Sequence, residues 1–206
     1  GSGLSYGLIE SLRQLRPERE LELVHRLDRD TSGCLIISKR RSALRELHRL
    51  IREGAMDKRY LALIVGELAR PEITVDAPLK KNILRGGERL VQVDPVEGKP
   101  ARTRFRRLRR LAFGDQCVTL VEAELITGRT HQIRVHAAHL GTPLVGDPKY
   151  GDEQANRALK PFGLTRLFLH ASALSLRLDY MTRPLRVEAP LPHELEQILA
   201  ALEAAA

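Results

Sequence analysis

Two neighbouring strand-like runs, residues 102–111 and 116–125, constrain the fold of this chain more than any other feature. They are joined around Phe113-Gly114-Asp115, and Gly followed by Asp is typical of a tight turn. The second run alternates at Cys117, Thr119, Val121 and Ala123. A period of two indicates a strand with one buried face. The sequence therefore predicts an antiparallel hairpin, and with it a sheet that this hairpin helps to build.

Further short apolar runs have the character of strands. They are residues 34–38, 60–65, 73–81 and 167–176. Pro78 breaks the third of them, and Arg85-Gly86-Gly87-Glu88 predicts a hairpin tip that leads into a strand at 90–93. Residues 141–151 are too rich in Gly and Pro for regular structure, and 152–163 are expected to form a polar surface segment.

Helical spacing of apolar residues marks three more segments. They are residues 43–51, 131–140 and the stretch that follows Pro192. Ser42 and Thr130 are the expected N-caps of the first two, and Gly54 and Gly141 their expected ends. Many strands interleaved with a few helices predict an α+β fold, a single domain whose mixed, largely antiparallel sheet is flanked by helices and loops.

The charge balance points to a polyanionic partner. Lys and Arg number 34 against 26 Asp and Glu, which gives a formal net charge of +8 and a pI near 9.9. Six arginines and no acidic residue lie within 101–110, and the planar arginine fork suits phosphate. Aromatic residues are only 4% of the chain, so a nucleic acid would be held mainly by its backbone. A solvated basic face is the alternative.

The composition also limits compartment and cofactor class. No apolar run is long enough to span a bilayer, and the first residues show no secretory signal. Cys34 and Cys117 are too few for a disulfide framework or a four-thiolate zinc site, so we expect buried thiols in a reducing cytoplasm.

The segment His25-Arg-Leu-Asp-Arg-Asp-Thr-Ser-Gly33 places Asp28 between arginines, just before an apolar run. Nearby positive charge favours the charged form of a carboxylate, which can then act as a nucleophile or base at neutral pH. Asp, Ser, Thr and Gly are also common turn residues, so the segment alone favours a structural turn.

Two other segments place reactive groups next to the ends of predicted elements: Tyr60 and the run 129–136. Arg134 falls about one helical turn after Thr130, where a half-buried guanidinium is expected. Because an unpaired buried charge costs about 3–5 kcal/mol, Arg134 requires a carboxylate, and Asp28 is a candidate.

The histidines of the same region suggest a metal site as an alternative. His136 and His139 lie three residues apart on the predicted helix, with His131 nearby. No carboxylate accompanies them in a known ligand pattern, and we therefore expect no metal.

Taken together, these segments resemble the RluA family of pseudouridine synthases. The resemblance rests on four ordered motifs and extends over nearly the whole chain. The motifs are His25-Arg-Leu-Asp-Arg-Asp-Thr-Ser-Gly33, Lys58-Arg-Tyr-Leu-Ala62, Gly128-Arg-Thr-His-Gln-Ile-Arg-Val-His136 and Gly146-Asp-Pro-Lys-Tyr-Gly151.

The resemblance implies a role for each matching residue. Asp28 is the nucleophile that attacks the target uridine at the ribose C1′. Tyr60 stacks on the base and helps to deprotonate C5, and Arg134 pairs with the aspartate and orients it. Arg26 enters the base stack that the flipped nucleotide leaves. The remaining residues expected to bind RNA are Arg29, Arg129, Arg102, Arg104 and Arg106, while Asp147 and Tyr150 are expected to shape the pocket rim and His25 to be structural.

The resemblance further implies that residues 1–206 form the catalytic domain of an isomerase that converts uridines of 23S ribosomal RNA to pseudouridine. It implies a cytoplasmic monomer that uses no cofactor or metal and contacts no membrane. Members carry upstream catalytic strands, and some an N-terminal S4 RNA-binding domain, which we expect to be absent from this chain. The alternatives are a synthase for other 23S rRNA or tRNA sites, a non-catalytic RNA-binding module and a metal-dependent hydrolase built on the histidines.

Overall fold

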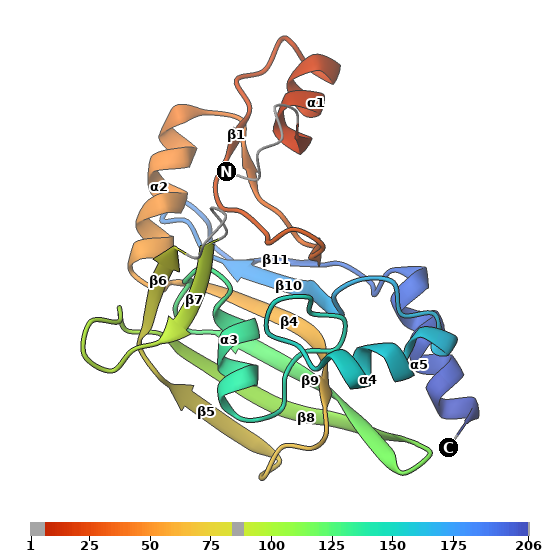
Figure 1. The fold of residues 1–206 in the computed structure, drawn as a ribbon. Helices are drawn as coiled ribbons and strands as arrows, with labels where there is room; N and C mark the ends of the chain where they lie inside the picture. The colour runs from red at the N-terminus through yellow and green to blue at the C-terminus, as the bar shows by residue number, and fades with distance from the viewer. Residues whose placement is uncertain (1–6, 84–88, 206) are drawn as a thin grey trace.

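The computed structural model describes residues 7–83 and 89–205, and Figure 1 shows their arrangement. The helices are α1 (Leu8–Leu15), α2 (Arg41–Arg52), α3 (Gln132–His139), α4 (Glu153–Ala158) and α5 (His193–Ala204), with a 3-10 turn η1 (Lys160–Phe162). The strands are β1 (Glu22–Leu23), β2 (Ser32–Gly33), β3 (Ile37–Ser38), β4 (Met56–Val65), β5 (Glu72–Asp76), β6 (Leu79–Ile83), β7 (Arg89–Val93), β8 (Arg102–Phe113), β9 (Gln116–Leu125), β10 (Leu169–Leu176) and β11 (Leu185–Glu188).

One seven-stranded sheet is the centre of the described structure. Its strands follow the order β11-β10-β4-β9-β8-β5, and β2 pairs with β10 off this path. The β2–β10 pairing is parallel and the others are antiparallel. The α+β class with a mixed, largely antiparallel sheet is therefore confirmed. β6 and β7 form a separate hairpin that stands beside α3 (Figure 1).

The predicted hairpin is present as β8 and β9, which turn at Gly114 and Asp115. Gly114 has a φ of +55°, a left-handed conformation that glycine adopts without steric cost. The register shifts between Arg107 and Arg109. Because an extra residue reverses which face each later side chain points to, this irregularity lets β8 contribute to both faces of the sheet.

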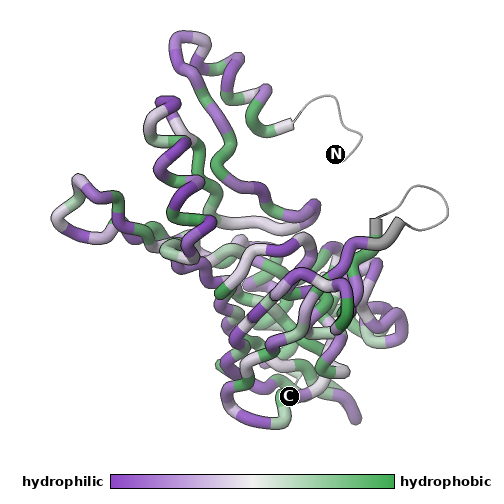
Figure 2. Tube along the Cα trace, turned by 90° about the vertical axis from the view of Figure 1, so that its left-hand side faces the viewer, coloured by the Kyte–Doolittle hydropathy of each residue, from purple (hydrophilic) through white to green (hydrophobic). Residues whose placement is uncertain are grey.

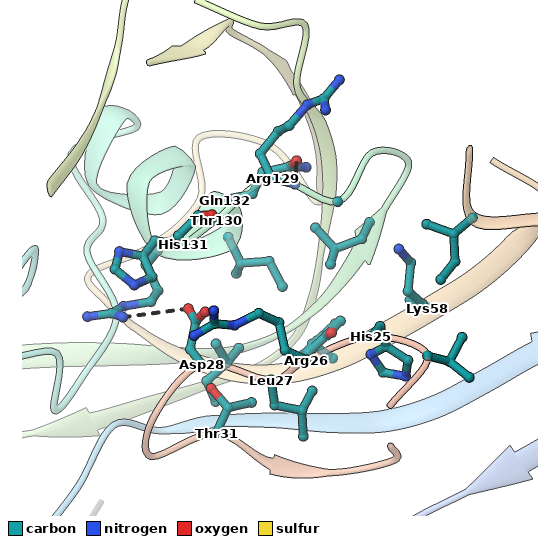
Figure 3. Close-up of a pocket in the computed structure, with 18 of the residues that line it drawn as sticks. His25, Arg26, Leu27, Asp28, Thr31, Lys58, Arg129, Thr130, His131 and Gln132 are labelled. Carbon is teal, nitrogen blue, oxygen red and sulfur yellow. Dashed lines mark hydrogen bonds and ion pairs between the residues drawn. The ribbon is translucent and has the colours of Figure 1, made fainter. Parts of the chain in front are cut away.

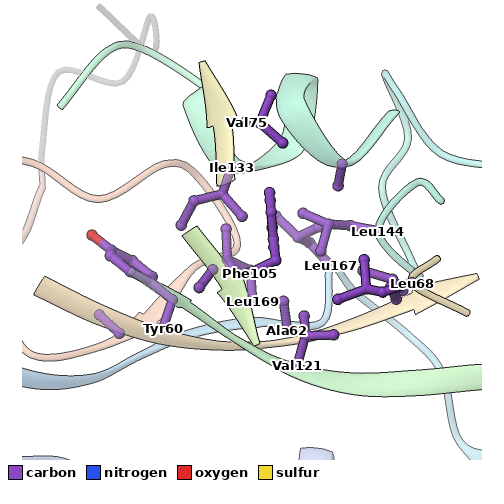
Figure 4. Close-up of a cluster of buried hydrophobic side chains, with 14 of the residues drawn as sticks. Tyr60, Ala62, Leu68, Val75, Phe105, Val121, Ile133, Leu144, Leu167 and Leu169 are labelled. Atoms are coloured by element: carbon purple, nitrogen blue, oxygen red, sulfur yellow. The ribbon is translucent and has the colours of Figure 1, made fainter. Parts of the chain in front are cut away.

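The face of the sheet that α3 covers holds the apolar core nearest to the candidate active site. Figure 4 shows Phe105 at the centre of this cluster, between Ile133 on one side and Val121 on the other, with Tyr60 at one end. These side chains come from β8, β9, α3 and β4, and Phe105 and Val121 are fully buried. Packing of α3 on this layer fixes the position of its first turn.

The opposite face of the sheet is covered by α5. Its buried residues Leu195, Ile198 and Leu202 pack with Leu63 of β4 and Leu111 of β8. α2 packs a third cluster against the ends of β4 and β10. Figure 2 shows hydrophobic segments gathered in the body of the sheet, while much of the N-terminal loop is hydrophilic.

Most other predicted strands and helix ends are confirmed. Pro78 separates β5 from β6, and Gly54 and Gly141 follow α2 and α3 with φ of +69° and +75°. Pro192 is the N-cap of α5. The expected hairpin tip at 85–88 lies outside the described residues.

Several local predictions are wrong. The strand expected at 34–38 is reduced to the two residues of β3, because the N–H of Cys34 instead donates to the carbonyl of Ala171. α2 begins after Arg40 and not Ser42, since Ser38 hydrogen-bonds the N–H and C=O of Arg40.

The start of α3 and the 152–163 segment also differ from expectation. α3 begins after His131, a residue later than expected, because His131 itself adopts a left-handed conformation and Thr130 makes no cap. The segment 152–163, expected to be a polar surface segment, contains the helix α4 and the turn η1. Asp152 caps α4 by accepting a hydrogen bond from the N–H of Ala155. None of the helices in the described part of the chain has the length and apolar content that crossing a membrane requires.

Candidate active site

A cavity of about 350 Å³ lies between the 24–31 loop, β4 and the loop that leads into α3. Figure 3 shows its side chains converging from these three segments, with Asp28 at one end and Lys58 toward the other. The 24–31 loop is held over the sheet because β2, which follows it, pairs with β10. A volume of this size suits a ligand as large as a nucleoside.

Asp28 and Arg134 meet at one end of the cavity. The guanidinium Nη1 of Arg134 lies 3.5 Å from Oδ2 of Asp28, and the pair is drawn as a dashed line in Figure 3. The Arg134 side chain is 6% exposed, whereas that of Asp28 is 20% exposed. The predicted pairing is therefore present, with the carboxylate as the partner that a ligand can reach.

Asp147 is the main partner of Arg134, a contact that the sequence did not indicate. Its two carboxylate oxygens accept hydrogen bonds of 2.7 Å from Nε and Nη2 of Arg134. Oδ1 also accepts from the N–H groups of Lys149 and Tyr150. Burial would raise the pKa of Asp147, but Arg134 and these N–H groups hold it below its ordinary value. Asp147, expected at the rim, is a fully buried anchor.

Tyr60 projects from β4 into the cavity, on the α3 face of the sheet. The residue is 7% exposed, and burial together with the negative charge of Asp28 raises the pKa of its phenol to about 12. The phenol therefore keeps its proton at neutral pH. Thr31, on the loop side of the same cavity, has a buried hydroxyl with no hydrogen-bond partner among the described residues.

The aromatic ring of Tyr150 also contacts the guanidinium of Arg134. The ring of Tyr150 lies 5.0 Å from the guanidinium carbon of Arg134, a cation–π distance. Its hydroxyl accepts from the N–H of Val91 at 3.0 Å and lies 2.8 Å from Nδ1 of His131. Tyr150 thus connects the β6–β7 hairpin to the start of α3 and is more than a rim residue.

Four cations surround the cavity without a matching carboxylate. They are Arg26, Arg52, Lys58 and Arg129, and no Asp or Glu in the described structure forms an ion pair with any of them. Arg26 and Arg129, expected to bind RNA, are therefore at the site. Arg29 is exposed on the same loop but does not line the cavity.

The arginines of β8 are placed differently. Thr103 and Phe105 point into the core under α3, so Arg102, Arg104 and Arg106 project from the other face. All six arginines of 101–110 have carboxylate partners, which are Asp76, Glu72, Glu124, Glu122, Glu67 and Glu203. The structure does not bring these arginines to the cavity, and their role in RNA binding stays a prediction.

The histidines do not form a metal cluster. His136 is fully buried and uses both ring nitrogens, Nδ1 with Thr103 and Nε2 with the carbonyl of Ala77. No group of three or more His, Cys, Asp or Glu residues in the described ranges is placed to hold a metal ion. The metal-dependent hydrolase therefore gains no support from their geometry.

Known protein families include one that matches the part of the chain with the Asp28–Arg134 pair. The sequence model of the RNA pseudouridylate synthases matches residues 2–139, a segment that contains Asp28, Tyr60 and Arg134. The chain belongs to this family. The resemblance to RluA-type pseudouridine synthases is thereby confirmed, and Asp147 and Tyr150 lie beyond the matched segment.

Individual pseudouridine synthases are similar over the full chain. Ribosomal large subunit pseudouridine synthase C of Salmonella typhi is 52% identical over 209 residues, and that of Escherichia coli K12 is 52% identical over 205. The alignments cover 100% and 98% of this chain but 64% and 63% of the relatives. The chain thus spans less than two thirds of the length of these proteins.

Solved structures of pseudouridine synthase domains share the fold. Human RNA pseudouridylate synthase domain containing 1 superposes with a TM-score of 0.73 at 29% identity, covering 95% of this chain and 84% of that one. Human RNA pseudouridylate synthase domain containing 4 gives 0.72 at 26% identity, covering 92% and 79%. Both likenesses support the interpretation of the described residues as a pseudouridine synthase domain.

Proposed function

We propose that this chain isomerises uridines of 23S ribosomal RNA to pseudouridine, with Asp28 as the nucleophile. The observation that carries the proposal is the Asp28–Arg134 pair at 3.5 Å, at the end of a nucleoside-sized cavity. The family match and the names of the 52% identical relatives support the reaction and the RNA class. A ribosomal RNA substrate would place the activity in the cytoplasm.

The proposed reaction begins with removal of the target uridine from its base stack, because C1′ and C5 are out of reach inside a helix. The Asp28 carboxylate attacks C1′ of the ribose, and the N1–C1′ bond breaks with its electron pair left on uracil. The base turns within the cavity, and C5 attacks C1′ and displaces Asp28. The proton on C5 is then lost and N1 gains one. Covalent catalysis divides one difficult exchange into easier steps.

Arg134 and Tyr60 have supporting roles in this proposal. Arg134 orients the Asp28 carboxylate toward the ribose and stabilises it when C5 displaces it. Tyr60 provides a wall for the base to stack on. Since the pKa of Tyr60 is about 12, its phenol is poorly suited to accept the proton from C5 at neutral pH. The reaction only rearranges the atoms of the nucleotide, so the proposed steps require no cofactor.

Replacement of Asp28 with Asn tests the assignment. We expect the variant to form no pseudouridine in a tritium-release assay on 23S rRNA, while its RNA affinity stays within a few-fold of wild type. Asp30→Asn is the matched control, because Asp30 is an exposed carboxylate of the same loop with a φ of +68° that Asn tolerates. Equal turnover by the Asp28 variant would show that another group is the nucleophile.

A mapping experiment tests the substrate. Primer extension on carbodiimide-treated 23S rRNA, from cells with and without the gene, should show stops that depend on the gene. Unchanged 23S rRNA, together with gene-dependent stops in tRNA, would show that the chain forms pseudouridine but that its substrate is tRNA and not 23S rRNA. RNA binding by the wild-type chain with no pseudouridine in any RNA would favour a non-catalytic RNA-binding module.

A further inference from the structure

The cavity continues beyond the reactive pair to a second end, where Lys58 lies (Figure 3). Lys58 and Tyr60 are two residues apart on β4 and therefore project from the same face of the strand. A strand rises about 3.4 Å per residue, which separates their positions by roughly 6.8 Å. This span is comparable to one extended nucleotide, so a group bound by Lys58 would be adjacent to a base that stacks on Tyr60.

The ammonium of Lys58 has no partner among the described residues. Within residues 7–83 and 89–205, no carboxylate pairs with its ammonium and no hydrogen bond is made to it. The side chain is half-buried, and this burial lowers its pKa. An ammonium in such a place is costly unless an anion compensates it. By contrast, the neighbouring Arg59, on the other face of β4, is paired with Asp57 and Glu122.

Two more cations line the cavity from other elements. Arg52 comes from the last turn of α2, and Arg129 comes from the loop before α3. The backbone of that loop comes close to Lys58, since a Cβ on Gly128 would lie 3.2 Å from its Nζ. Three separate segments thus contribute cations to the lining of the cavity, and none of the three has a carboxylate partner among the described residues. The guanidinium of Arg129 points away from Lys58 in Figure 3, and its Nε–H donates to the carbonyl of Pro100.

We propose that Lys58 binds a phosphodiester next to the flipped uridine, and that Arg52 and Arg129 continue the path of the RNA backbone at the rim. The inference rests on the proposed function, because it names the part of the RNA substrate that this end of the cavity recognises. It explains why the half-buried ammonium lacks a protein partner: the RNA supplies the anion.

A double-mutant cycle tests the pairing of Lys58 with one phosphate. The RNA is a short fragment around a uridine identified by the mapping, with a neutral methylphosphonate at each flanking position in turn. The protein variants are Lys58→Met, which keeps the length of the side chain, and Lys58→Arg, both made on the Asp28→Asn chain to prevent turnover. Lys160→Met, an exposed lysine of η1 outside the cavity, is the control.

We expect Lys58→Met to weaken binding about tenfold, as a charge-assisted contact predicts, and Lys58→Arg to recover most of the loss. One methylphosphonate position should weaken binding about tenfold for the chain with Lys58 but hardly at all for the Lys58→Met variant. Lys160→Met should leave affinity unchanged. Equal affinity of Lys58→Met and its parent, or equal methylphosphonate penalties in both at every position, would overturn the proposal.

Stability separates this role from a structural one. Because the half-buried charge has no partner in the part of the chain that the structure describes, Lys58→Met should unfold at the same temperature as its parent or higher. A clear loss of stability would show that Lys58 serves the fold and would also overturn the inference. These affinities do not depend on turnover. Once the mapping has identified the uridine, a failed Lys58 test would therefore refute this inference alone and leave the proposed function standing.

Discussion

At the level of single residues, Asp147 controls how Arg134 presents its guanidinium. The two hydrogen bonds of 2.7 Å occupy Nε and Nη2, which leaves Nη1 directed to Asp28. Asp147 is in turn fixed by the N–H groups of Lys149 and Tyr150. The orientation of the Asp28 carboxylate therefore depends on a residue that does not line the cavity.

Replacing Asp147 with Asn should destabilise the chain and reduce turnover. Removing one partner of a buried ion pair costs about 3–5 kcal/mol, because the other charge is left without compensation. Thermal unfolding and the tritium-release assay measure the two effects. Asp152→Asn is the control, since Asp152 caps α4 and Asn caps a helix equally well.

The pH dependence of this loss follows from the lowered pKa of Asp147. A depressed pKa contributes stability above the ordinary Asp value of about 3.9, and that contribution is lost as the pH falls toward the lower folded value. The difference in stability between wild type and Asp147→Asn should therefore shrink below about pH 4. A difference that stays constant from neutral pH down to about pH 3 would contradict the charged pair.

The residues of the candidate site differ in how far the sequence predicts their positions and contacts. The need of a half-buried Arg134 for an anion predicts its pairing with a carboxylate, and the pair with Asp28 is found. Asp147 escapes prediction because an Asp in a loop rich in Gly and Pro has the signature of a turn residue, and it does bind two backbone N–H groups as turn residues do. Its second role is visible only in three dimensions.

At the level of elements, the short strand β2 determines where the Asp28 loop lies. Gly33 pairs with Ala171 of β10 in parallel and has a φ of +109°, which only glycine adopts readily. A Cβ at this position would lie 2.2 Å from the carbonyl oxygen of Ala171. Close approach of the two backbones thus ties the loop to the sheet beside Tyr60.

Gly33→Ala should displace this loop and reduce both stability and turnover. Left-handed backbone costs a non-glycine residue about 1–2 kcal/mol, and the clash adds about 1–3 kcal/mol. Gly66→Ala is the matched control, because Gly66 has a φ of +77° and a Cβ at that position would meet nothing within 4 Å. Chemical denaturation should show the larger loss at Gly33. Equal losses in the two variants would show that the close approach to Ala171 is unimportant.

Local patterns predict the elements whose determinants are local. The β8–β9 hairpin follows from alternation and a Gly-Asp turn, and α5 follows from Pro192 and its apolar stripe. The 34–38 run does not form one continuous strand, because its two ends hydrogen-bond to different segments. The N–H of Cys34 donates to the carbonyl of Ala171, and Ile37 and Ser38 pair with β1 as the strand β3. Apolar residues in a short run do not reveal which backbone lies beside them.

At the level of the whole molecule, the unpaired positive charge does not lie in the segment where basic residues are densest. The six arginines of 101–110 face carboxylates of β5, β9 and other segments, so much of their charge is neutralised within the protein. By contrast, Arg26, Arg52, Lys58 and Arg129 around the cavity have no carboxylate partners in the described ranges. Long-range attraction of RNA follows the net charge of +8, but close contact should follow the unpaired cations.

The salt dependence of RNA affinity distinguishes the two groups of arginines. Replacing Arg52 and Arg129 with Gln should remove two phosphate contacts and make the slope of log K against log salt less steep by about 1.4, at about 0.7 per contact for a single strand. The same double change at Arg104 and Arg106 should leave the slope nearly unchanged, because Glu124 and Glu122 already neutralise these side chains. Both double variants lose the same formal charge, so the comparison removes the effect of net charge alone. A flatter slope for the Arg104 and Arg106 variant only would move the RNA path to the opposite face of the sheet.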